Sequence, residues 1–210
     1  MKRIKYHHIL LTGFAMLFAA CSDFGDINKD PNSPQEVPTQ SLISNVEKKI
    51  MNAVRSTTLS IGGTDLYVQW LANNTYTDAD RYYWLSTTGN TVWSDLYLAQ
   101  NNLDEIIRLN TREETRLQAA ANGPNENQIA ASRILKVWTY QIMTDAWGDI
   151  PYNSYAGKNP AFDSGKAEED IIYPQYAIQE DIYKDMLNEL KEASLQIDVD
   201  QPAFRQGDAI

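Results

Sequence analysis

The chain has 210 residues, a formal net charge of −10 and a composition of 43% hydrophobic and 22% charged residues. These values are typical of one globular domain that folds without disulfides or metal, and they exclude disordered and collagen-like proteins. The excess of acidic residues disfavours binding to nucleic acid or to an anionic membrane surface, since both repel negative charge.

Histidine and cysteine are nearly absent from the chain. His7 and His8 lie close to the start, and Cys21 is the only cysteine. If the leader described below is removed and Cys21 is modified, the processed chain has neither an imidazole nor a thiol. That excludes Ser-His-Asp triads, Cys-His pairs and histidine zinc sites, and no glycine-rich nucleotide-binding pattern occurs. We therefore expect no catalytic residue, no metal and no cofactor, and predict that the protein is not an enzyme.

Residues 1–20 have the layout of a secretory signal peptide. The basic stretch Lys2-Arg3-Ile4-Lys5 precedes an apolar run over 9–20, and small residues follow at its end. The apolar run is too short for a transmembrane helix, which needs roughly twenty residues.

The end of this leader resembles a bacterial lipobox. Leu17-Phe18-Ala19-Ala20-Cys21 has the expected layout, although Phe18 departs from the preferred aliphatic residue. In a lipobox the cysteine receives a lipid and becomes the new first residue, and a lone cysteine in an exported chain has no intramolecular partner. We predict lipidation of Cys21 and membrane attachment through this anchor. The alternative is an ordinary signal peptide with an incidental cysteine.

Residues 21–38 are predicted to form a lipidated tether with an irregular course, because they are rich in proline and turn formers. The acidic stretch 22–26 resembles the surface-export signal of lipoproteins in the Bacteroidota. Asp26-x-Asn28-x-Asp30 imitates the first half of a calcium loop. Pro31, however, stands where glycine is needed, and Val37 stands where the bidentate glutamate should be, so we expect no calcium there.

Residues 39–210 are predicted to form an all-α domain. Apolar residues recur at spacings of three and four, which is typical of one helix face. The five stripes are Leu42, Val46, Ile50, Ala53 and Val54; Leu66, Tyr67, Trp70 and Leu71; Val92, Trp93, Leu96, Tyr97, Leu103, Ile106 and Ile107; Ile129, Ala130, Ile134, Val137, Trp138 and Ile142; and Ile178, Ile182, Met186, Leu187, Leu190, Ala193 and Ile197. Such stripes are buried by stacking helices on each other, and no segment alternates with the period of a large sheet.

Finer expectations follow from these stripes. Trp70, Trp93 and Trp138 are predicted to be core residues, and Thr39 or Ser41 is predicted to cap the first helix. The two clearest helices, near 92–110 and 127–147, begin about 35 residues apart, close to a tetratricopeptide period.

Two connections between these helices are long. Residues 111–126 are polar and are predicted to be a plain link between helices. Residues 148–177 carry three prolines and five aromatic residues, and loops of that length are more often functional than idle.

An aromatic and polar cluster interrupts the helical pattern between the second and third stripes. Its residues, predicted to contact a ligand, are Asn73, Asn74, Tyr76, Asp78, Asp80, Arg81, Tyr82, Tyr83 and Trp84. Aromatic rings suit the apolar faces of sugars, and carboxylates and amides suit their hydroxyl groups. An oligosaccharide or a peptide would fit such a surface. The alternatives are that the rings cover helix ends or face a partner protein.

The fourth helix ends in Thr144-Asp145-Ala146-Trp147-Gly148-Asp149-Ile150-Pro151-Tyr152. Gly148 is suited to ending a helix and Pro151 to preventing a restart. We expect Trp147 to bury against the helices, and Asp145 or Asp149 to accept hydrogen bonds from backbone amides. A structural role alone can therefore explain this motif, without a ligand.

The same motif carries a family resemblance. Residues 130–138 followed by 144–152 resemble the hallmark of SusD/RagB-type lipoproteins of the Bacteroidota. Other segments match in the expected order, namely Asn28–Pro34, Trp93-x-x-Leu96-Tyr97 with Asn101-Asn102, and Gln179–Tyr183. The similarity spans about residues 26–197 and is closest to the branch with an Asn-x-x-Pro start.

The resemblance implies a superhelical fold of stacked, tetratricopeptide-like helix pairs. Because family members are much longer, this chain would be only the N-terminal portion, and no binding residue is taken over from the family. The resemblance also implies residence on the outer face of the outer membrane. It implies a SusC-like TonB-dependent transporter as the partner, over which the protein would sit as a lid. The implied role is non-catalytic capture of nutrients, chiefly glycans, for import through that transporter.

Two other interpretations stay open. A glycoside hydrolase with two carboxylates needs no histidine. Asp145 and Asp149 are four residues apart, although Gly148 is expected to break the helix between them. The second is a truncated, non-functional fragment that does not complete its helix stack.

Overall fold

The computed structural model describes residues 37–157, 162 and 174–205. The chain divides into residues 1–37 and 38–210, and the second unit is described here by itself. The predictions for the signal peptide, Cys21, the acidic stretch and the calcium-like spacing lie outside the described residues. Within the described part, no helix combines the length and the apolar character needed to cross a membrane.

The described residues are mostly α-helical. The α-helices are α2 (Thr39–Val54), α3 (Thr64–Tyr67), α4 (Asn90–Thr111), α5 (Arg116–Ala119), α6 (Asn125–Trp147) and α7 (Gln179–Gln196), with single 3-10 turns at η2 (Ala79–Arg81), η3 (Ala120–Asn122) and η4 (Tyr155–Gly157). The strands β1 (Ile150–Pro151) and β2 (Tyr176–Ala177) pair antiparallel, with Ile150 opposite Ala177. The prediction of an all-α fold is confirmed, whereas the tetratricopeptide-like arrangement stays a prediction.

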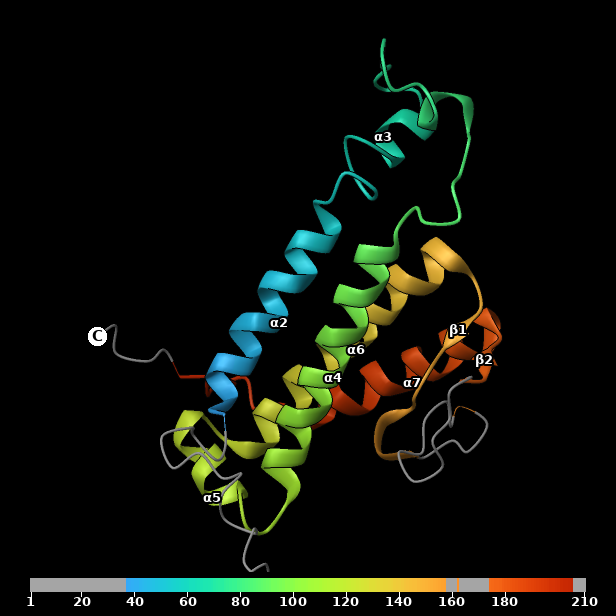
Figure 1. Ribbon diagram of the computed structural model, residues 1–210. Helices are drawn as coiled ribbons and strands as arrows, with labels where there is room; N and C mark the ends of the chain where they lie inside the picture. The colour runs from blue at the N-terminus through green and yellow to red at the C-terminus, as the bar shows by residue number, and fades with distance from the viewer. Residues whose placement is uncertain (1–36, 158–161, 163–173, 206–210) are drawn as a thin grey trace, which may run out of the picture. The chain divides into compact units, whose positions relative to one another are not determined.

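The four long helices pack in chain order, α2 on α4, α4 on α6 and α6 on α7 (Figure 1). One hydrophobic cluster joins α2 to α4 through residues such as Val46, Ile50 and Leu103. A second cluster joins α4, α6, β1, β2 and α7 and includes Leu96 and Ile182. Each buried aliphatic side chain contributes about 1.5–3 kcal/mol. The two middle helices, α4 and α6, each pack against two neighbours and therefore hold the stack together. Trp93 and Trp138 pack against these clusters with part of each ring exposed.

Three finer expectations were wrong. Trp70 is not a core residue, since 82% of it is exposed. The helix that was expected to contain Trp70, α3, has only one turn and ends at Tyr67, because Gln69 takes a left-handed conformation (φ 60°). Trp70 therefore lies beyond the helix. On α7, Ile178, Leu187 and Leu190 are exposed, because α7 packs on α6 with the face that carries Ile182 and Met186.

The third error concerns the start of α2. Neither Thr39 nor Ser41 caps it; Pro38 is the N-cap residue, and its carbonyl accepts the backbone N–H groups of Ser41 and Leu42. Thr39 is instead the first helical residue and is buried.

The connection 111–126 is also more than a plain link. It contains α5 and η3, and the buried side chain of Gln128 donates to the carbonyls of Ala119 (2.9 Å) and Gly123 (2.7 Å). These bonds hold the connection against the first turn of α6. Its polar composition therefore reflects internal hydrogen bonding as well as solvation.

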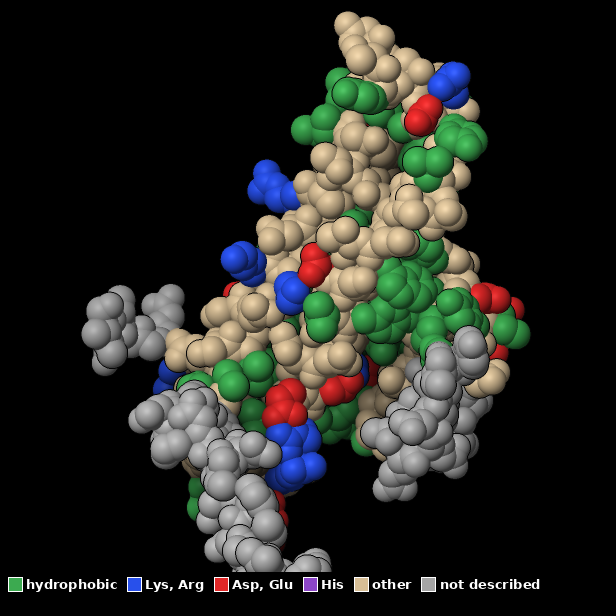
Figure 2. Space-filling model, in the orientation of Figure 1, with side chains coloured by type: hydrophobic (Ala, Val, Ile, Leu, Met, Phe, Trp, Pro, Cys, Tyr) green, Lys and Arg blue, Asp and Glu red, His purple; other side chains and the backbone are tan. Residues whose placement is uncertain are grey.

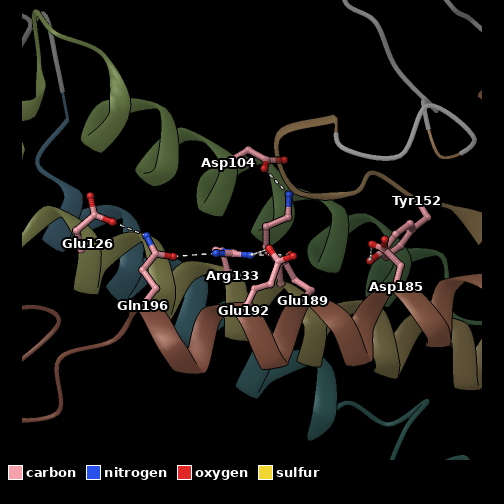
Figure 3. A network of polar contacts seen from close by, with 9 residues as sticks. Asp104, Glu126, Arg133, Tyr152, Asp185, Glu189, Glu192 and Gln196 are labelled. Atoms are coloured by element: carbon pink, nitrogen blue, oxygen red, sulfur yellow. Dashed lines mark hydrogen bonds and ion pairs between the residues drawn. The ribbon is translucent and has the colours of Figure 1, made fainter.

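A polar network crosses the interface of α6 and α7 (Figure 3). Nε of Arg133 lies 2.5 Å from one carboxylate oxygen of Glu189, and Nη2 lies 2.9 Å from the other. Arg133 also donates to Glu192 and Gln196, and its guanidinium carbon lies 4.0 Å from the centre of the Tyr155 ring. The pKa of Arg133 is raised, chiefly by the hydrogen bond to Glu189. Through Arg133, this network fixes α7 and the segment after α6 to α6 itself.

Candidate functional site

The candidate site is the segment between α2 and α4, residues 64–85, here called the aromatic lobe. It contains α3 and η2 and lies where α2 ends and α4 begins (Figure 1). Leu66 is its one fully buried side chain, with 1% exposed. Hydrophobic side chains lie exposed over its surface (Figure 2). The lobe is therefore held by hydrogen bonds and ring contacts rather than by a core of its own.

Three rings of the lobe form a stack with Tyr67 in the middle. The rings of Tyr67 and Tyr82 are 6.1 Å apart with an angle of 19° between their planes, and those of Tyr67 and Trp84 are 5.7 Å apart at 30°. Offset stacking of this kind contributes about 0.5–1.5 kcal/mol per pair. Burial raises the pKa of the Tyr67 hydroxyl. The stack presents the outer sides of Tyr82 and Trp84 to solvent.

The large side chains of the lobe are unusually accessible. The exposed fractions are Trp70 82%, Tyr76 85%, Tyr82 61%, Tyr83 59% and Trp84 46%. Monomeric proteins seldom expose contiguous apolar surface of this kind unless it binds something. The structure brings the predicted rings together in one lobe and adds Trp70, which the sequence analysis assigned to the core.

A signal for Trp70 was present in the sequence. The apolar stripe that contains Trp70 is short. One turn before it stand Gly62 and Gly63, and one turn after it stand Asn73 and Asn74, so no apolar residue extends it in either direction. A stripe confined to one turn does not specify a buried helix face.

Most of the predicted polar residues brace the lobe from within. The backbone N–H of Asn73 donates to both carboxylate oxygens of Asp80 (3.2 and 3.3 Å), and the Asn73 side chain donates to the carbonyl of Tyr76. Arg81 pairs with Asp78 at 3.0 Å.

Asn74 accepts a hydrogen bond from Thr75, its neighbour in the chain. These contacts close the loop between α3 and η2. They leave the rings, rather than the carboxylates, as the main surface that the lobe offers to a ligand.

The charge of the lobe is negative. It contains three carboxylates, Asp65, Asp78 and Asp80, and a single arginine, Arg81, which is paired with Asp78. A surface of this sign repels anionic ligands.

The helix-stop motif lies elsewhere, at the end of α6. The helix ends at Trp147, and Gly148 follows with φ 77° and ψ −121°, a positive φ as expected. The carboxylate of Asp149 accepts the backbone N–H of Gln179 at 2.9 Å, and Asp145 accepts the hydroxyl of Tyr183. Both carboxylates of the motif are thus engaged in structural contacts, as expected for Asp149.

The other residues of the motif are also structural. The ring of Trp147 meets that of Trp93 edge to face at 5.2 Å. The carbonyl of Pro151 accepts the Tyr97 hydroxyl at 2.7 Å, and the Tyr152 hydroxyl donates to Asp185 at 2.8 Å. The motif fixes the exit of α6 to α4 and α7.

Neither region has the groups of a metal site. No three His, Cys, Asp or Glu side chains gather in a way that would hold a metal ion among the residues whose positions are described. The chemistry available in the aromatic lobe is stacking and hydrogen bonding.

Comparison with known families agrees with this picture. The chain matches, over residues 31–210, the model of a SusD-like family described as "Starch-binding associating with outer membrane". No curated protein and no solved structure matches it. Because the family match covers most of the sequence and the described fold is all-α, the resemblance found in the sequence is confirmed, and the chain belongs to the SusD-like family.

Proposed function

We propose that the protein captures neutral glycans on the aromatic lobe, without chemical conversion, for import across the outer membrane. The observation that carries the proposal is the accessible group of rings around the Tyr67 stack. Sugar rings have flat C–H faces that stack on aromatic side chains. The family description, starch binding with association to the outer membrane, supports the same class of ligand.

The charge of the lobe favours a neutral glycan over an acidic one. Its only arginine is bound to Asp78 and to the Thr77 carbonyl, so its hydrogen-bonding capacity is partly used. Uronic-acid or sulfated polymers would meet three carboxylates without a free cation to compensate. We therefore expect neutral oligosaccharides to bind and polygalacturonate to be rejected.

The test is calorimetric titration of the purified chain with a panel of neutral oligosaccharides, polygalacturonate and unrelated peptides. Trp70→Ala and Trp84→Ala should each weaken binding about 2- to 13-fold, the factor that corresponds to the roughly 0.5–1.5 kcal/mol of one stacked ring pair. Tyr176→Ala is the matched control, since its ring is 61% exposed but lies on β2. The proposal fails if no neutral glycan binds, or if Tyr176→Ala weakens binding as much as the lobe variants.

The anchoring part of the proposal rests on Cys21. We propose that residues 1–20 are a lipoprotein signal peptide, that residues 21–38 are a lipidated tether, and that 39–210 form the surface-exposed domain. Cys21→Ala should abolish lipid labelling and release the protein from the membrane fraction, because acyl chains supply the attachment. Unchanged fractionation of Cys21→Ala would contradict this.

A SusC-like TonB-dependent transporter is the proposed partner. Capture of a glycan at the surface serves import only if a channel receives it, and the family description, association with the outer membrane, supports such a partner. Co-purification from detergent-solubilised outer membranes should recover a large TonB-dependent barrel with the wild-type protein. Recovery of no such barrel would contradict the partnership.

A further inference from the structure

The aromatic lobe contains two turns of the same construction. Each follows a short helical segment, and in each the chain closes with a pair of backbone hydrogen bonds. In the first turn Gln69 N–H donates to Leu66 O (3.0 Å) and Trp70 N–H to Asp65 O (3.0 Å). This is the Schellman pattern, in which the donor of the inner bond, here Gln69, takes a left-handed conformation.

The second turn repeats the pattern thirteen residues later. Tyr82 N–H donates to Ala79 O (3.0 Å), and Tyr83 N–H donates to Asp78 O (2.8 Å). Gln69 has φ 60° and Tyr82 has φ 57°, whereas this position usually holds glycine. A side chain with a β-carbon is strained there, and strain that persists in a structure points to a role for that side chain.

The two strained side chains bond to each other. Nε2 of Gln69 donates to the hydroxyl of Tyr82 at 3.2 Å, and that hydroxyl donates in turn to the carbonyl of Tyr67 at 3.1 Å. The Tyr82 ring, held at its hydroxyl, stacks on Tyr67, which also carries Trp84. The chain of contacts therefore runs from Gln69 through Tyr82 to the ring stack.

The residue after each left-handed position is an aromatic one that does not pack inward. In a Schellman turn this next residue usually makes a hydrophobic contact with the helix that precedes it. Here Trp70 is 82% exposed and Tyr83 is 59% exposed. The paired turns thus present a ring outward from each turn while their left-handed residues join the turns together.

We infer that Gln69 and Tyr82 are positioning residues of the lobe, whose mutual hydrogen bond fixes the two turns so that the rings are arranged before a ligand arrives. This inference rests on the proposed glycan-binding function. A lobe with no core loses conformational freedom when it binds, and fixing its rings beforehand lowers that loss. Gln69 acts through Tyr82 and needs no contact with the ligand.

The direction of the hydrogen bonds gives a sharp test. The Tyr82 hydroxyl donates its proton to Tyr67, so residue 69 must supply a donor if both bonds are to persist. A carboxylate at position 69 could bond to this hydroxyl only by accepting the proton that Tyr67 now accepts. Gln69→Lys keeps a donor and should bind glycan like the wild type, whereas Gln69→Glu has only acceptors at neutral pH and should bind more weakly. Tyr82→Phe keeps the ring and removes both bonds. Gln69→Glu and Tyr82→Phe should each raise the Kd for glycan about 2- to 10-fold, as expected for the loss of one or two hydrogen bonds, at an unchanged Tm.

Gln69→Gly separates positioning from mere folding. Glycine relieves the left-handed strain, so this variant should be at least as stable as the wild type and still bind glycan more weakly. If Gln69→Gly, Gln69→Glu and Tyr82→Phe all bind like the wild type, or if binding falls only in step with Tm, the inference is overturned.

A second readout does not depend on a ligand. The near-ultraviolet circular dichroism of Trp84, obtained as the difference from Trp84→Phe, reports its stacking on Tyr67. This signal should weaken in Gln69→Glu and persist in Gln69→Lys. If the wild type binds no glycan, the proposed function fails, but the circular dichroism signal of Trp84 still tests the positioning role. An equal signal in Gln69→Glu and Gln69→Lys would refute that role.

Discussion

The guanidinium of Arg133 and the carboxylate of Glu189 form a two-pronged ion pair in the interface of α6 and α7, with side chains only 5% and 10% exposed (Figure 3). Removing one partner of such a pair leaves the other charge buried without compensation, which costs more than the pair itself contributes. Arg133 keeps weaker contacts to Glu192 and Gln196, which lie at the more exposed end of the network.

Glu189→Ala should therefore lower the free energy of unfolding by about 3 kcal/mol. Urea denaturation of the purified chain measures this. Glu180→Ala is the matched control, because its side chain, on the same helix and paired with Lys184, is 76% exposed, and ion pairs at such exposed sites contribute little to stability. Equal losses in the two variants would show that the buried pair does not hold α7.

Asp149 acts as a distant cap for α7. Its carboxylate accepts the N–H of Gln179, the first residue of the helix, whose own N-cap residue, Ile178, offers no side-chain acceptor. Asp149→Ala should cost about 0.5–2 kcal/mol, and Asp149→Asn, which retains an acceptor, should cost less. Thermal unfolding of the two variants measures the difference. A greater loss in Asp149→Asn than in Asp149→Ala would contradict the capping role.

The limits of the sequence analysis follow from particular residues. The long stripes of α4 and α6 fixed the all-α fold, because a period of 3.6 sustained over several turns has only one structural solution. The error at Trp70 arose where one strained residue, Gln69, stopped a helix that local composition favoured. The exposed leucines of α7 show that a stripe reveals which residues are apolar, not whether a neighbouring helix covers them.

The candidate site, too, was predictable from the sequence only in part. The rings of the aromatic lobe were recognised from composition, since aromatic residues outside a helical stripe stand out. The internal use of Asp80 was not predictable, because it depends on a contact with the backbone of Asn73 that closes only in three dimensions. Asp78 pairs instead with Arg81, three residues further along the chain. The left-handed conformations of Gln69 and Tyr82 could not be predicted from the residue types, because glycine is the usual residue at such positions.

Three tyrosines, of which Tyr140 and Tyr152 are buried and Tyr97 is half-buried, should make the free energy of unfolding fall at high pH. Burial is the largest cause that raises the pKa of Tyr97, Tyr140 and Tyr152 above the usual value near 10. Above about pH 10 the unfolded chain loses these protons and the folded chain retains them. The unfolded state then binds fewer protons, so the free energy of unfolding decreases as pH rises. Below the unfolded pKa the full contribution is present.

The slope should reach about 1.4 kcal/mol per pH unit for each such group. Tyr97→Phe removes one of them, along with its bond to the Pro151 carbonyl. This variant should be less stable near neutral pH and lose stability less steeply than the wild type between about pH 9 and about pH 11. Urea denaturation across that range measures both slopes. Parallel slopes would show that Tyr97 ionises alike in the folded and unfolded chains.

The tryptophan of the helix-stop motif depends on a glycine far away in the chain. Gly89, the N-cap residue of α4, has φ 86°, and a β-carbon built there would lie 2.9 Å from Cζ2 of Trp147. Gly89→Ala should therefore cost about 1–3 kcal/mol, through both the left-handed conformation and the steric overlap. The overlap is the part that depends on Trp147.

A double-mutant cycle with Trp147→Phe separates the two causes. The smaller ring leaves room for the added methyl group, so Gly89→Ala should cost less in the Trp147→Phe background, with a coupling of about 0.5 kcal/mol or more. The backbone strain stays the same in both backgrounds. Strict additivity would show that Trp147 does not rest against Gly89.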